Sequence, residues 1–300
     1  MTKIHFIINP IAGKGIQYLS MGLLRSIFTP EIYTIEIKYS KYKKHATILT
    51  NQSIFDGAQI IVACGGDGTI NEVASCLINT TIKLGIVPIG SGNGLASNLN
   101  IPRKIIDSLQ IIKQQEAIKI DVGKVNENYF FSNTGVGFDA AVIKNYESSN
   151  KRTFIGYIMA CITSFNELKS AKKIEIKIND SIFETDPFLV FISNSNELGY
   201  KFSLTPKASL QDGLLDVLII SKINKLKMIW LGLLVLINKP FLLKEASYYK
   251  TDKLEVRNKK QNFFETQIDG EFSTIKTEKL IINVNQNALQ VISPNVTRLF

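Results

Sequence analysis

Asp67 lies between glycines in the stretch Ile60–Leu77, IIVACGGDGTINEVASCL. Glycines at 65, 66 and 68 let the main chain approach a phosphate without interference from Cβ atoms, and Thr69 adds a hydroxyl as a helix begins. A carboxylate repels a polyphosphate unless Mg²⁺ or its water shell lies between them. An alternative role for Asp67 is to take a proton from an attacking hydroxyl. Both roles belong to phosphoryl transfer. The chain has no GxxxxGK[ST] loop, so the ordinary P-loop is excluded.

Two further glycine loops follow other predicted strands. INPIAGKG leaves the first strand with Asn9, Pro10, Gly13, Lys14 and Gly15, and VPIGSGNGLA leaves a later one with Ser91, Asn93 and Gly94. Each loop alone is also ordinary turn chemistry. In a doubly wound sheet, however, ligands bind at the carboxyl ends of the strands. Three glycine loops at one sheet edge therefore predict a nucleotide site.

Acidic residues form two candidate sites in the second half of the chain. In QIDGEF, Asp269 and Glu271 are two residues apart and would face the same way on an extended strand, although a solvated pair at a hairpin edge is the simpler alternative. In TPKASLQDGLLDVLII, Asp212-Gly213 precedes a strand, and a type I turn explains it equally well.

The elements that position these residues alternate between strand and helix patterns over the first 120 residues. AQIIVAC is a continuous apolar run, which is typical of a parallel strand covered on both faces. We predict an α/β three-layer domain with a mostly parallel sheet. The predicted strands cover residues 3–9, 32–40, 58–64 and 83–89, and the predicted helices cover residues 17–28, 45–52, 69–77 and 103–115.

From about Ile118 the pattern changes to short alternating strands separated by turn residues. Two helical insertions interrupt them, at residues 156–168 and 225–236. We predict a second, mainly antiparallel β-sandwich domain. The expected division is an α/β nucleotide domain at 1–120 and a β-sandwich domain at 121–300, with the last residues returning to pack on the first domain.

Composition limits the setting of the protein. The 300 residues are 45% hydrophobic with a net charge of +9, of which residues 221–260 carry +7. This basic region is either a solvated face or attracted to an anionic surface; no zinc-finger or RNA-binding signature accompanies it, so we expect no nucleic-acid partner. Three widely spaced cysteines suit a reduced cytoplasm, and the N-terminus is expected to form a strand, not a signal peptide. The apolar run 228–237 is too short to span a bilayer.

Together, the three glycine loops and the later acidic segments resemble the diacylglycerol kinase catalytic domain of the lipid-kinase superfamily, which includes sphingosine and ceramide kinases. The resemblance extends over nearly the whole chain. It implies that ATP contacts residues in all three loops and after the second strand: Asn9, Ser40, Gly65, Gly66, Asp67, Gly68, Thr69, Asn71 and Ser91.

The resemblance also implies roles for the acids. Glu271 would accept the proton of the lipid hydroxyl, and Asp121 would link Glu271 to Asp67 in the catalytic group. A structural Mg²⁺ would be held by the Asp212 carboxylate and the carbonyls of Ser209 and Leu214. One position departs from the family: bacterial diacylglycerol kinases of this type usually carry Asp where this chain has Gly94. The loop is closer to the sphingosine- and ceramide-kinase form, so the acceptor stays open.

These observations predict a cytoplasmic, Mg²⁺-dependent kinase that moves the γ-phosphate of ATP to a lipid hydroxyl and contacts an anionic membrane surface peripherally. Exposed strand edges in the second domain would allow a homodimer. An NAD kinase shares the Gly-Gly-Asp-Gly signature and is the nearest alternative. A non-catalytic lipid-binding module is the alternative from another class, although the presence of Asp67, Asp121, Asp212 and Glu271 disfavours it.

Overall fold

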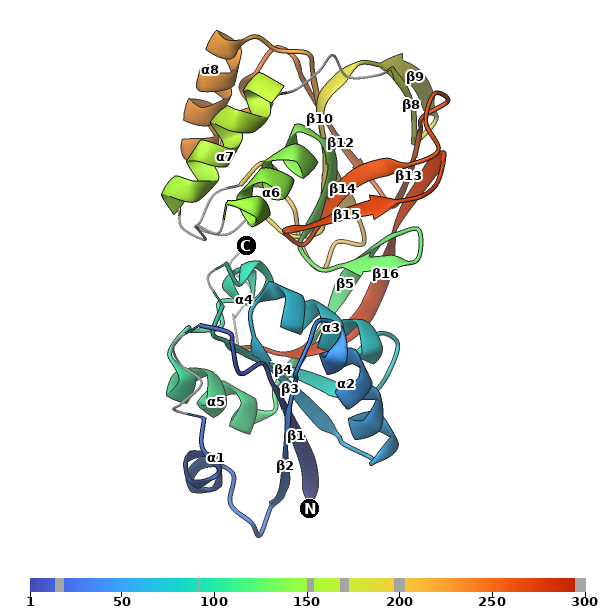
Figure 1. Cartoon of the computed structure of the whole chain (residues 1–300). Helices are drawn as coiled ribbons and strands as arrows, with labels where there is room; N and C mark the ends of the chain where they lie inside the picture. The colour runs from blue at the N-terminus through green and yellow to red at the C-terminus, as the bar shows by residue number, and fades with distance from the viewer. Residues whose placement is uncertain (14–18, 91, 150–153, 168–172, 197–202, 295–300) are drawn as a thin grey trace. The chain divides into compact units, whose positions relative to one another are not determined.

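The computed structural model describes residues 1–13, 19–90, 92–149, 154–167, 173–196 and 203–294 (Figure 1). The chain divides into two compact units. The first comprises Met1–Ile120 and the described residues after Gln286, and the second comprises Asp121–Gln286. The chain passes from the first unit to the second within β5 (Ala117–Val125) and returns within β16 (Lys279–Ile292). Among the described helices, none combines the length and apolarity that a membrane span requires.

A parallel sheet forms the centre of the first unit. Its strand order is β2-β1-β3-β4-β16, and every neighbouring pair is parallel, the last through Val291 opposite Leu84. The first strand in the sequence is therefore an interior strand, with β2 on one side and β3 on the other. Four strands precede the crossing into the second unit: β1 (Thr2–Ile8), β2 (Tyr33–Tyr39), β3 (Ile60–Gly65) and β4 (Lys83–Pro88).

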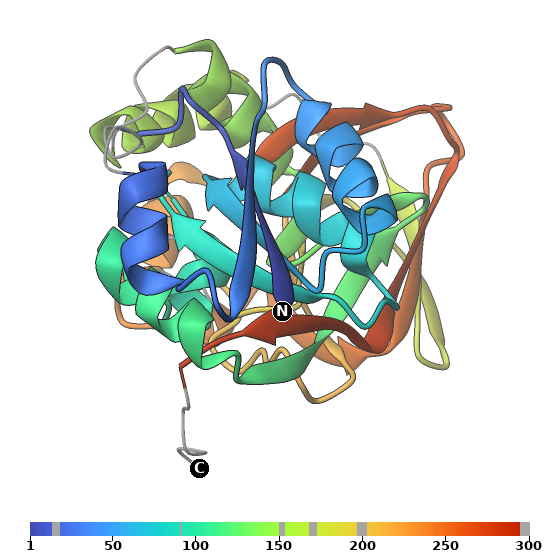
Figure 2. The same cartoon turned by 90° about the horizontal axis from the view of Figure 1, so that it is seen from below.

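Helices cover both faces of this sheet. In Figure 2, α2 and α3 lie on one side of the strands, and α1 and α5 lie on the other. Every residue of β3 is buried, as its apolar run predicts for a strand covered twice. The predicted α/β three-layer fold is thus confirmed. The helices are α1 (Met21–Ile27), α2 (His45–Phe55), α3 (Asp67–Leu77), α4 (Gly94–Asn98) and α5 (Ile105–Gln114).

The second unit contains a six-stranded sheet in which all neighbours are antiparallel. In spatial order its strands are β12 (Ala246–Thr251), β11 (Leu215–Ser221), β10 (Pro187–Ser193), β7 (Asn133–Gly137), β14 (Phe264–Ile268) and β15 (Glu271–Ile275). A second antiparallel group runs from β16 through β13 (Lys253–Arg257) and β8 (Ile174–Ile178) to β9 (Ser181–Thr185), and β6 (Asn128–Phe130) pairs with β5.

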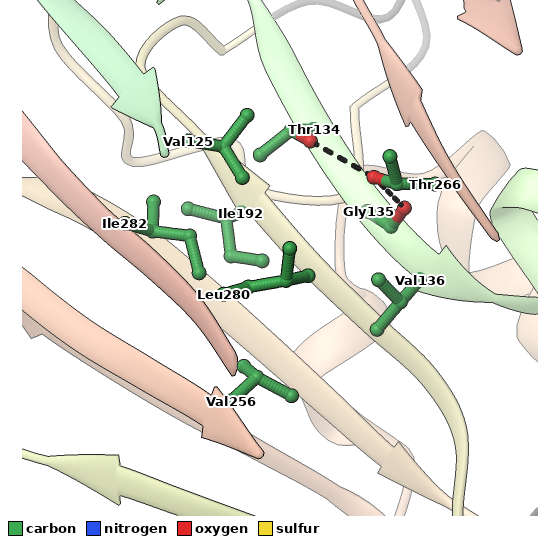
Figure 3. Close-up of a pocket in the computed structure, with 9 residues that line it drawn as sticks. All are labelled: Val125, Thr134, Gly135, Val136, Ile192, Val256, Thr266, Leu280 and Ile282. Atoms are coloured by element: carbon green, nitrogen blue, oxygen red, sulfur yellow. Dashed lines mark hydrogen bonds between the residues drawn. The ribbon is translucent and has the colours of Figure 1, made fainter. Parts of the chain in front are cut away.

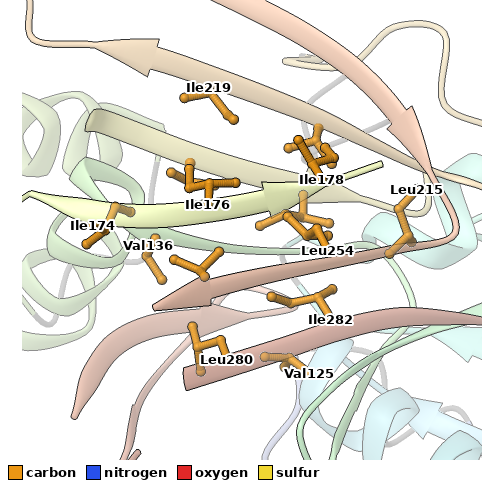
Figure 4. Close-up of a cluster of buried hydrophobic side chains, with 14 of the residues drawn as sticks. Val125, Val136, Ile174, Ile176, Ile178, Leu215, Ile219, Leu254, Leu280 and Ile282 are labelled. Carbon is orange, nitrogen blue, oxygen red and sulfur yellow. The ribbon is translucent and has the colours of Figure 1, made fainter. Parts of the chain in front are cut away.

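The two antiparallel groups face each other across one apolar core (Figure 4). Ile192 and Val217 of the six-stranded sheet belong to the same buried cluster as Ile176 and Val256 of the other group. Period-2 alternation on each strand supplies these inward side chains. The predicted antiparallel β-sandwich is confirmed.

The opposite face of the six-stranded sheet is covered by helices. Phe191 and Leu218, which alternate with the sandwich residues, pack in a separate cluster with Leu231 and Leu234 of α8 (Lys225–Leu236). β10 is therefore buried along its whole length. The predicted helical insertions correspond to α7 (Phe154–Glu167) and α8, which is followed by a short 3₁₀ helix, η2 (Pro240–Leu242). An additional helix, α6 (Phe138–Ser148), was not expected from the sequence.

A small space remains inside the sandwich between Val125, Ile192, Val256 and Leu280 (Figure 3). Thr134 and Thr266 line it, and Thr266 Oγ1 donates to the carbonyl of Gly135 at 2.8 Å. The space has no room for a water molecule. It is a packing gap in the core and no candidate ligand site.

Candidate active site

The carboxyl ends of four parallel strands place the predicted nucleotide residues at one edge of the first unit's sheet. Asn9 follows β1, Ser40 follows β2, and Gly66 follows β3. Main-chain hydrogen bonds hold these exits together: Asn9 N donates to Cys64 O at 2.9 Å, and Ser40 N donates to Ile8 O at 2.8 Å. The sheet therefore gathers residues that are far apart in the sequence, where ligands bind in open α/β sheets.

Glycines allow the three loops to approach one another closely. A Cβ added at Gly90 would lie 2.4 Å from the Cα of Gly66, so any side chain there would push the second and third loops apart. Gly13 in the first loop has φ +61°, and a Cβ there would lie 2.0 Å from Ile89 O. These glycines leave a rim of main chain, which is a surface that suits phosphate oxygens.

Helix α3 begins at Asp67, directly after Gly66, so its N-terminus faces this rim. The first hydrogen bond of the helix runs from Ile70 N to Gly66 O at 3.0 Å. The N–H groups before Ile70 therefore have no acceptor within the helix ladder. Unpaired N–H groups and the positive end of the helix dipole favour an anion at this point. The helix starts two residues earlier than the sequence indicated.

The Asp67 carboxylate joins the second loop to the third. Oδ2 accepts from Asn93 N and Oδ1 accepts from Gly94 N, each at 2.7 Å. Burial raises the pKa of Asp67, although the N–H groups of Asn93, Gly94 and Asp67 itself and the Arg103 charge act in the opposite direction. Arg103 itself donates to Gly92 O at 2.9 Å. A carboxylate offers about four lone-pair sites, more than these N–H donors use, so the donor set fits a Mg²⁺ ion bound to Asp67 through water.

Asn93 shapes the third loop and was not among the predicted ligands. It is buried with φ +59°, a left-handed conformation that Asn tolerates. Its side chain donates to Gly90 O at 2.7 Å and accepts from Gly90 N at 3.1 Å. The loop is thereby closed on itself, with its main-chain N–H groups directed at Asp67.

Asn9 and Thr69 meet at the same edge. Asn9 Nδ2 donates to Thr69 Oγ1 at 3.2 Å, and Asn9 Oδ1 accepts from Ile11 N at 3.2 Å. A Cβ added at Gly65 would lie 2.4 Å from the Thr69 side chain, which explains the glycine before the signature. Two predicted ATP ligands from separate loops are thus in direct contact.

Glu72 explains how the segment after β2 is held beside α3. Its two carboxylate oxygens accept from Lys44 N at 2.8 Å and from Ala46 N at 3.0 Å. These N–H groups lie at the start of α2, where an acceptor stabilises the helix end. Buried Ser40 immediately precedes this segment.

Asn71, one helical turn before Ser75, accepts from the Ser75 hydroxyl at 3.3 Å.

Asp121 lies in the second unit and is almost completely buried. Its Oδ2 accepts from Gly213 N at 2.7 Å, and its carbonyl accepts from Asn194 Nδ2 at 2.7 Å. Asn194 Nδ2 also donates to Phe131 O at 3.1 Å. The predicted catalytic acid is therefore bonded to the turn that carries Asp212, a link the sequence did not indicate.

The Asp-Gly-Glu segment forms a turn in the structure. Asp269 and Gly270 have φ +48° and +80° between β14 and β15, so the expectation that Asp269 and Glu271 share one extended strand is wrong. Asp269 Oδ1 accepts from Ser132 N at 2.7 Å and from the N–H groups of Phe131 and Asn133, each at 3.1 Å.

Glu271 is the first residue of β15 and lies opposite Ile268 of β14. Its side chain is half-buried. Asp269 fixes the turn to the segment 131–133, and Asn194 connects that segment to Asp121. Glu271 and Asp121 are thus attached to one hydrogen-bonded network of the second unit, which gives both acids defined main-chain positions.

The predicted structural Mg²⁺ ligands form a different arrangement. Lys250 Nζ lies 2.7 Å from Asp212 Oδ2 and 3.6 Å from Asp216 Oδ2, and donates to Lys207 O at 3.4 Å. The pKa of Lys250 is raised. Burial alone would lower it, but the hydrogen bond to Asp212 and the charges of Asp216 and Asp212 outweigh burial. An ammonium already stands against the Asp212 carboxylate. This donor set does not fit Mg²⁺, and no step below depends on a metal there.

The remaining predicted ligands of that site have local contacts. Ser209 Oγ accepts from Gln211 N at 3.3 Å, and Leu214 N donates to Asp212 Oδ1 at 3.1 Å. Ser91, Lys14 and Gly15 lie outside the described residues. Asp67 belongs to the first unit, whereas Asp121 and Glu271 belong to the second. The link from Glu271 through Asp121 to Asp67 stays a prediction.

Glu72, Asn93 and Asn194 hold segments that carry predicted site residues, but none of the three was among the predicted ligands or catalytic acids. A signal existed for Asn93, because Asn before a predicted helix and among glycines favours a left-handed residue. Glu72 follows the Gly65–Thr69 signature, but its role was not predicted, and Asn194 gave no signal. Their partners are 26 or more residues away in the sequence.

Comparison with protein families gives two adjoining matches. Residues 3–125 match the diacylglycerol kinase catalytic domain, and residues 132–293 match the YegS C-terminal NAD kinase beta sandwich-like domain. Together the two matches include both units of the structure.

Individual proteins agree with these matches. The chain is 26% identical to a diacylglycerol kinase of Bacillus subtilis (strain 168), over 91% of this chain and 90% of that protein. It is 28% identical to a diacylglycerol kinase of Staphylococcus aureus, over 60% of this chain and 58% of that protein. A crystal structure described as a diacylglycerol kinase from Bacillus anthracis str. Sterne aligns with a TM-score of 0.71 and 19% identity, over 99% of this chain and 98% of that one.

Proposed function

Because the chain belongs to the diacylglycerol kinase family of lipid kinases, we propose that it transfers the γ-phosphate of ATP to the hydroxyl of a membrane lipid in a Mg²⁺-dependent reaction. Diacylglycerol or a sphingoid-type lipid is the proposed acceptor. The observation that carries the proposal is the convergence of three glycine loops and the α3 N-terminus at one sheet edge, with Asp67 bonded across two of the loops.

ATP is proposed to bind along this edge. The N–H groups at the start of α3 and the glycine main chain would receive the phosphates, since anions are favoured at a helix N-terminus. Ser91 is proposed as a further contact of the third loop. The other proposed contacts are Asn9, Ser40, Gly65, Gly66, Asp67, Gly68, Thr69 and Asn71.

The acids are proposed to handle the acceptor hydroxyl. The lipid oxygen attacks the γ-phosphorus, the bond from phosphorus to the bridging β–γ oxygen breaks, and ADP leaves. The hydroxyl proton passes to the Glu271 carboxylate, directly or through one water. Asp121, held by Gly213 N at 2.7 Å, is proposed to orient the acid group without itself bonding to the phosphate.

Mg²⁺, when bound with ATP, neutralises charge on the phosphates. Asp67 is proposed to hold it through water, because both carboxylate oxygens already accept a main-chain N–H. Those two bonds favour the ionised carboxylate and fix its orientation, while burial has the larger effect and raises its pKa. Asp67 would thus contribute a negative charge at a defined point of the edge.

Transfer of labelled phosphate from ATP tests the proposal. The acceptor panel is diacylglycerol, sphingosine, ceramide, an undecaprenol and NAD, each with and without Mg²⁺. We expect label in a lipid and none in NAD. Label in NAD alone would identify an NAD kinase, and no label in any acceptor, with intact binding to lipid, would favour a non-catalytic module.

Two variants test the roles of the acids. Asp67→Ala and Glu271→Gln should each lower kcat by about 10²–10³-fold, the range for a lost charge-stabilising or proton-accepting group. Exposed Glu31, changed to Gln, is the matched control and should retain full activity. Melting temperature is measured for all three, because a loss of activity counts only for a folded variant. A Glu271→Gln enzyme of wild-type kcat would remove the proposed proton acceptor.

A further inference from the structure

Helix α8 is apolar around its whole circumference although only one side of it is buried. Its sequence is KLKMIWLGLLVL, with buried Leu231 and Leu234 facing the cluster over β10 and β11. A helix that is apolar all round is normally enclosed by protein or by lipid. The opposite side carries large exposed side chains at helical spacing: Leu226 (77% exposed), Ile229 (60%), Trp230 (53%), Leu233 (49%) and Leu236 (59%).

Helix α7 adds a second exposed apolar stripe. Ile155, Ile158, Met159 and Ile162 recur at three- and four-residue intervals and are between 42% and 73% exposed. Phe165 of α7 packs against the same cluster as the buried side of α8, and Figure 1 shows the two helices next to each other. We define the docking face as the exposed apolar side chains of α7 and α8. Scattered apolar residues are common on surfaces, but two neighbouring stripes mark an interaction site.

Lysines lie at both ends of α8. Lys222 and Lys225 are at its start, and Lys239 and Lys244 follow its end. Between residues 221 and 245 the only acid is Glu245, which pairs with Lys227. Cations in the first turn oppose the helix dipole, and no acid in that turn offsets them, so α8 gains no helix stability from Lys225 and Lys227. Helix stability therefore does not account for these lysines.

We propose that the docking face inserts into the interfacial region of an anionic lipid bilayer, with the apolar stripes among the acyl chains and the flanking lysines at the headgroup phosphates. Trp230 suits this level, where one side of its ring is apolar and its N–H is polar. A second copy of the chain is a poorer occupant, because it would bring the same lysines opposite one another. The inference deepens the proposed function by assigning the surface through which the enzyme reaches a lipid acceptor.

The chain contains one tryptophan, so Trp230 reports on its own environment. Vesicles of 70% phosphatidylcholine and 30% phosphatidylglycerol should shift its fluorescence to the blue, and brominated acyl chains in those vesicles should quench it. Vesicles of phosphatidylcholine alone should cause a smaller change, since the lysines then lack anionic partners. Unchanged fluorescence with the anionic vesicles would overturn the proposal.

A double variant, Ile229→Gln with Leu233→Gln, keeps the tryptophan and removes part of the apolar stripe. Vesicle affinity should fall by at least about tenfold, because two apolar side chains no longer leave water. The matched control is Ile182→Gln, an exposed isoleucine (64%) on β9 of the same unit. Equal melting temperatures establish that both variants are folded. Equal vesicle binding by the double variant and the control would contradict the docking face.

Kinase activity separates this inference from the proposed function. With lipid in detergent micelles the double variant should match wild type, whereas with vesicles it should lose activity in proportion to binding. Vesicle binding without phosphate transfer would support the docking face and contradict the proposed function. Concentration-dependent dimers that the double variant abolishes, with no vesicle binding by wild type, would assign the face to a second copy and defeat the inference.

Discussion

At the scale of single residues, the site depends on carboxylates that are bound by main-chain N–H groups. Asp67 accepts two such bonds, Asp269 accepts from three successive residues, and Asp121 accepts from Gly213. Bonds of this kind favour the ionised acid and fix its direction. An acid so held can place charge, or a bound water, at one point without rotating away.

The ion pairs of Lys250 give a prediction about stability. The β11–β12 register places it directly opposite Asp216, whose carboxylate is fully buried and bonded to the Tyr248 hydroxyl. Lys250→Met should lower the free energy of unfolding by about 1–2 kcal/mol, less than a fully buried pair would cost because the Lys250 side chain remains about a third exposed.

Metal removal distinguishes Lys250 from a structural Mg²⁺. EDTA should leave the wild-type melting temperature unchanged, since the ammonium already provides a positive charge beside Asp212 and Asp216. In Lys250→Met the two acids lack that charge, and added Mg²⁺ should raise the melting temperature of the variant alone. A fall in wild-type melting temperature with EDTA, reversed by Mg²⁺ in the absence of nucleotide, would restore Ser209, Asp212 and Leu214 as metal ligands.

At the scale of elements, α6 introduces an acid into an apolar environment. Asp139, in the first turn of α6, lies next to Gly135 of β7, and a Cβ at Gly135 would approach its Oδ2 to 2.5 Å. Burial raises the pKa of Asp139 to about 6, with Gln267 acting in the opposite direction. Its Oδ2 has no hydrogen-bond partner among the described residues. Packing of α6 against the sheet therefore favours the protonated acid.

The pH dependence of stability follows from that raised pKa. The contribution of protonated Asp139 is complete below about pH 4 and is lost as the pH rises through about 6. Asp139→Asn imitates the protonated form at every pH. Chemical denaturation should show the variant gaining on wild type between about pH 4 and 6, by up to about 3 kcal/mol in total. Parallel stability curves for the two proteins over that range would show that Asp139 titrates normally.

At the scale of the whole molecule, the two units have separate cores and contribute different parts of the proposed reaction. The parallel sheet carries the glycine loops, and the antiparallel sandwich carries Asp121, Glu271 and the docking face. Each unit is compact by itself. A ligand that binds one of them should therefore leave its signature in that unit.

Amide hydrogen exchange tests this division of labour. ATP with Mg²⁺ should slow exchange in peptides covering residues 9–13, 65–72 and 90–94. These loops follow strands that end at the same sheet edge, where ATP is proposed to bind. Peptides of β9 and β12 in the sandwich should be unaffected and act as the internal control. Protection confined to the sandwich would place the nucleotide outside the first unit and contradict the proposed ATP site.

The sequence by itself determined the local features of this protein. Apolar runs followed by glycine loops predicted parallel strands with a binding edge, and alternation after Ile118 predicted an antiparallel sandwich, because strand period and turn chemistry are properties of a few neighbouring residues. It failed where local pattern was ambiguous. Residues 138–148 form α6 although their apolar residues mark no clear helical face, and Asp269 occupies a turn instead of a strand.

Tertiary structure alone decided which groups meet. Asp67 reaches Asn93 across 26 residues, Glu72 caps α2, and Lys250 faces Asp216 through a strand register that no local signal specifies. It also decided that the apolar helix α8 keeps one side outside the core. The physical reason is common to these cases: hydrogen bonds, ion pairs and burial depend on distances in space, and chain folding sets those distances between residues that are remote in the sequence.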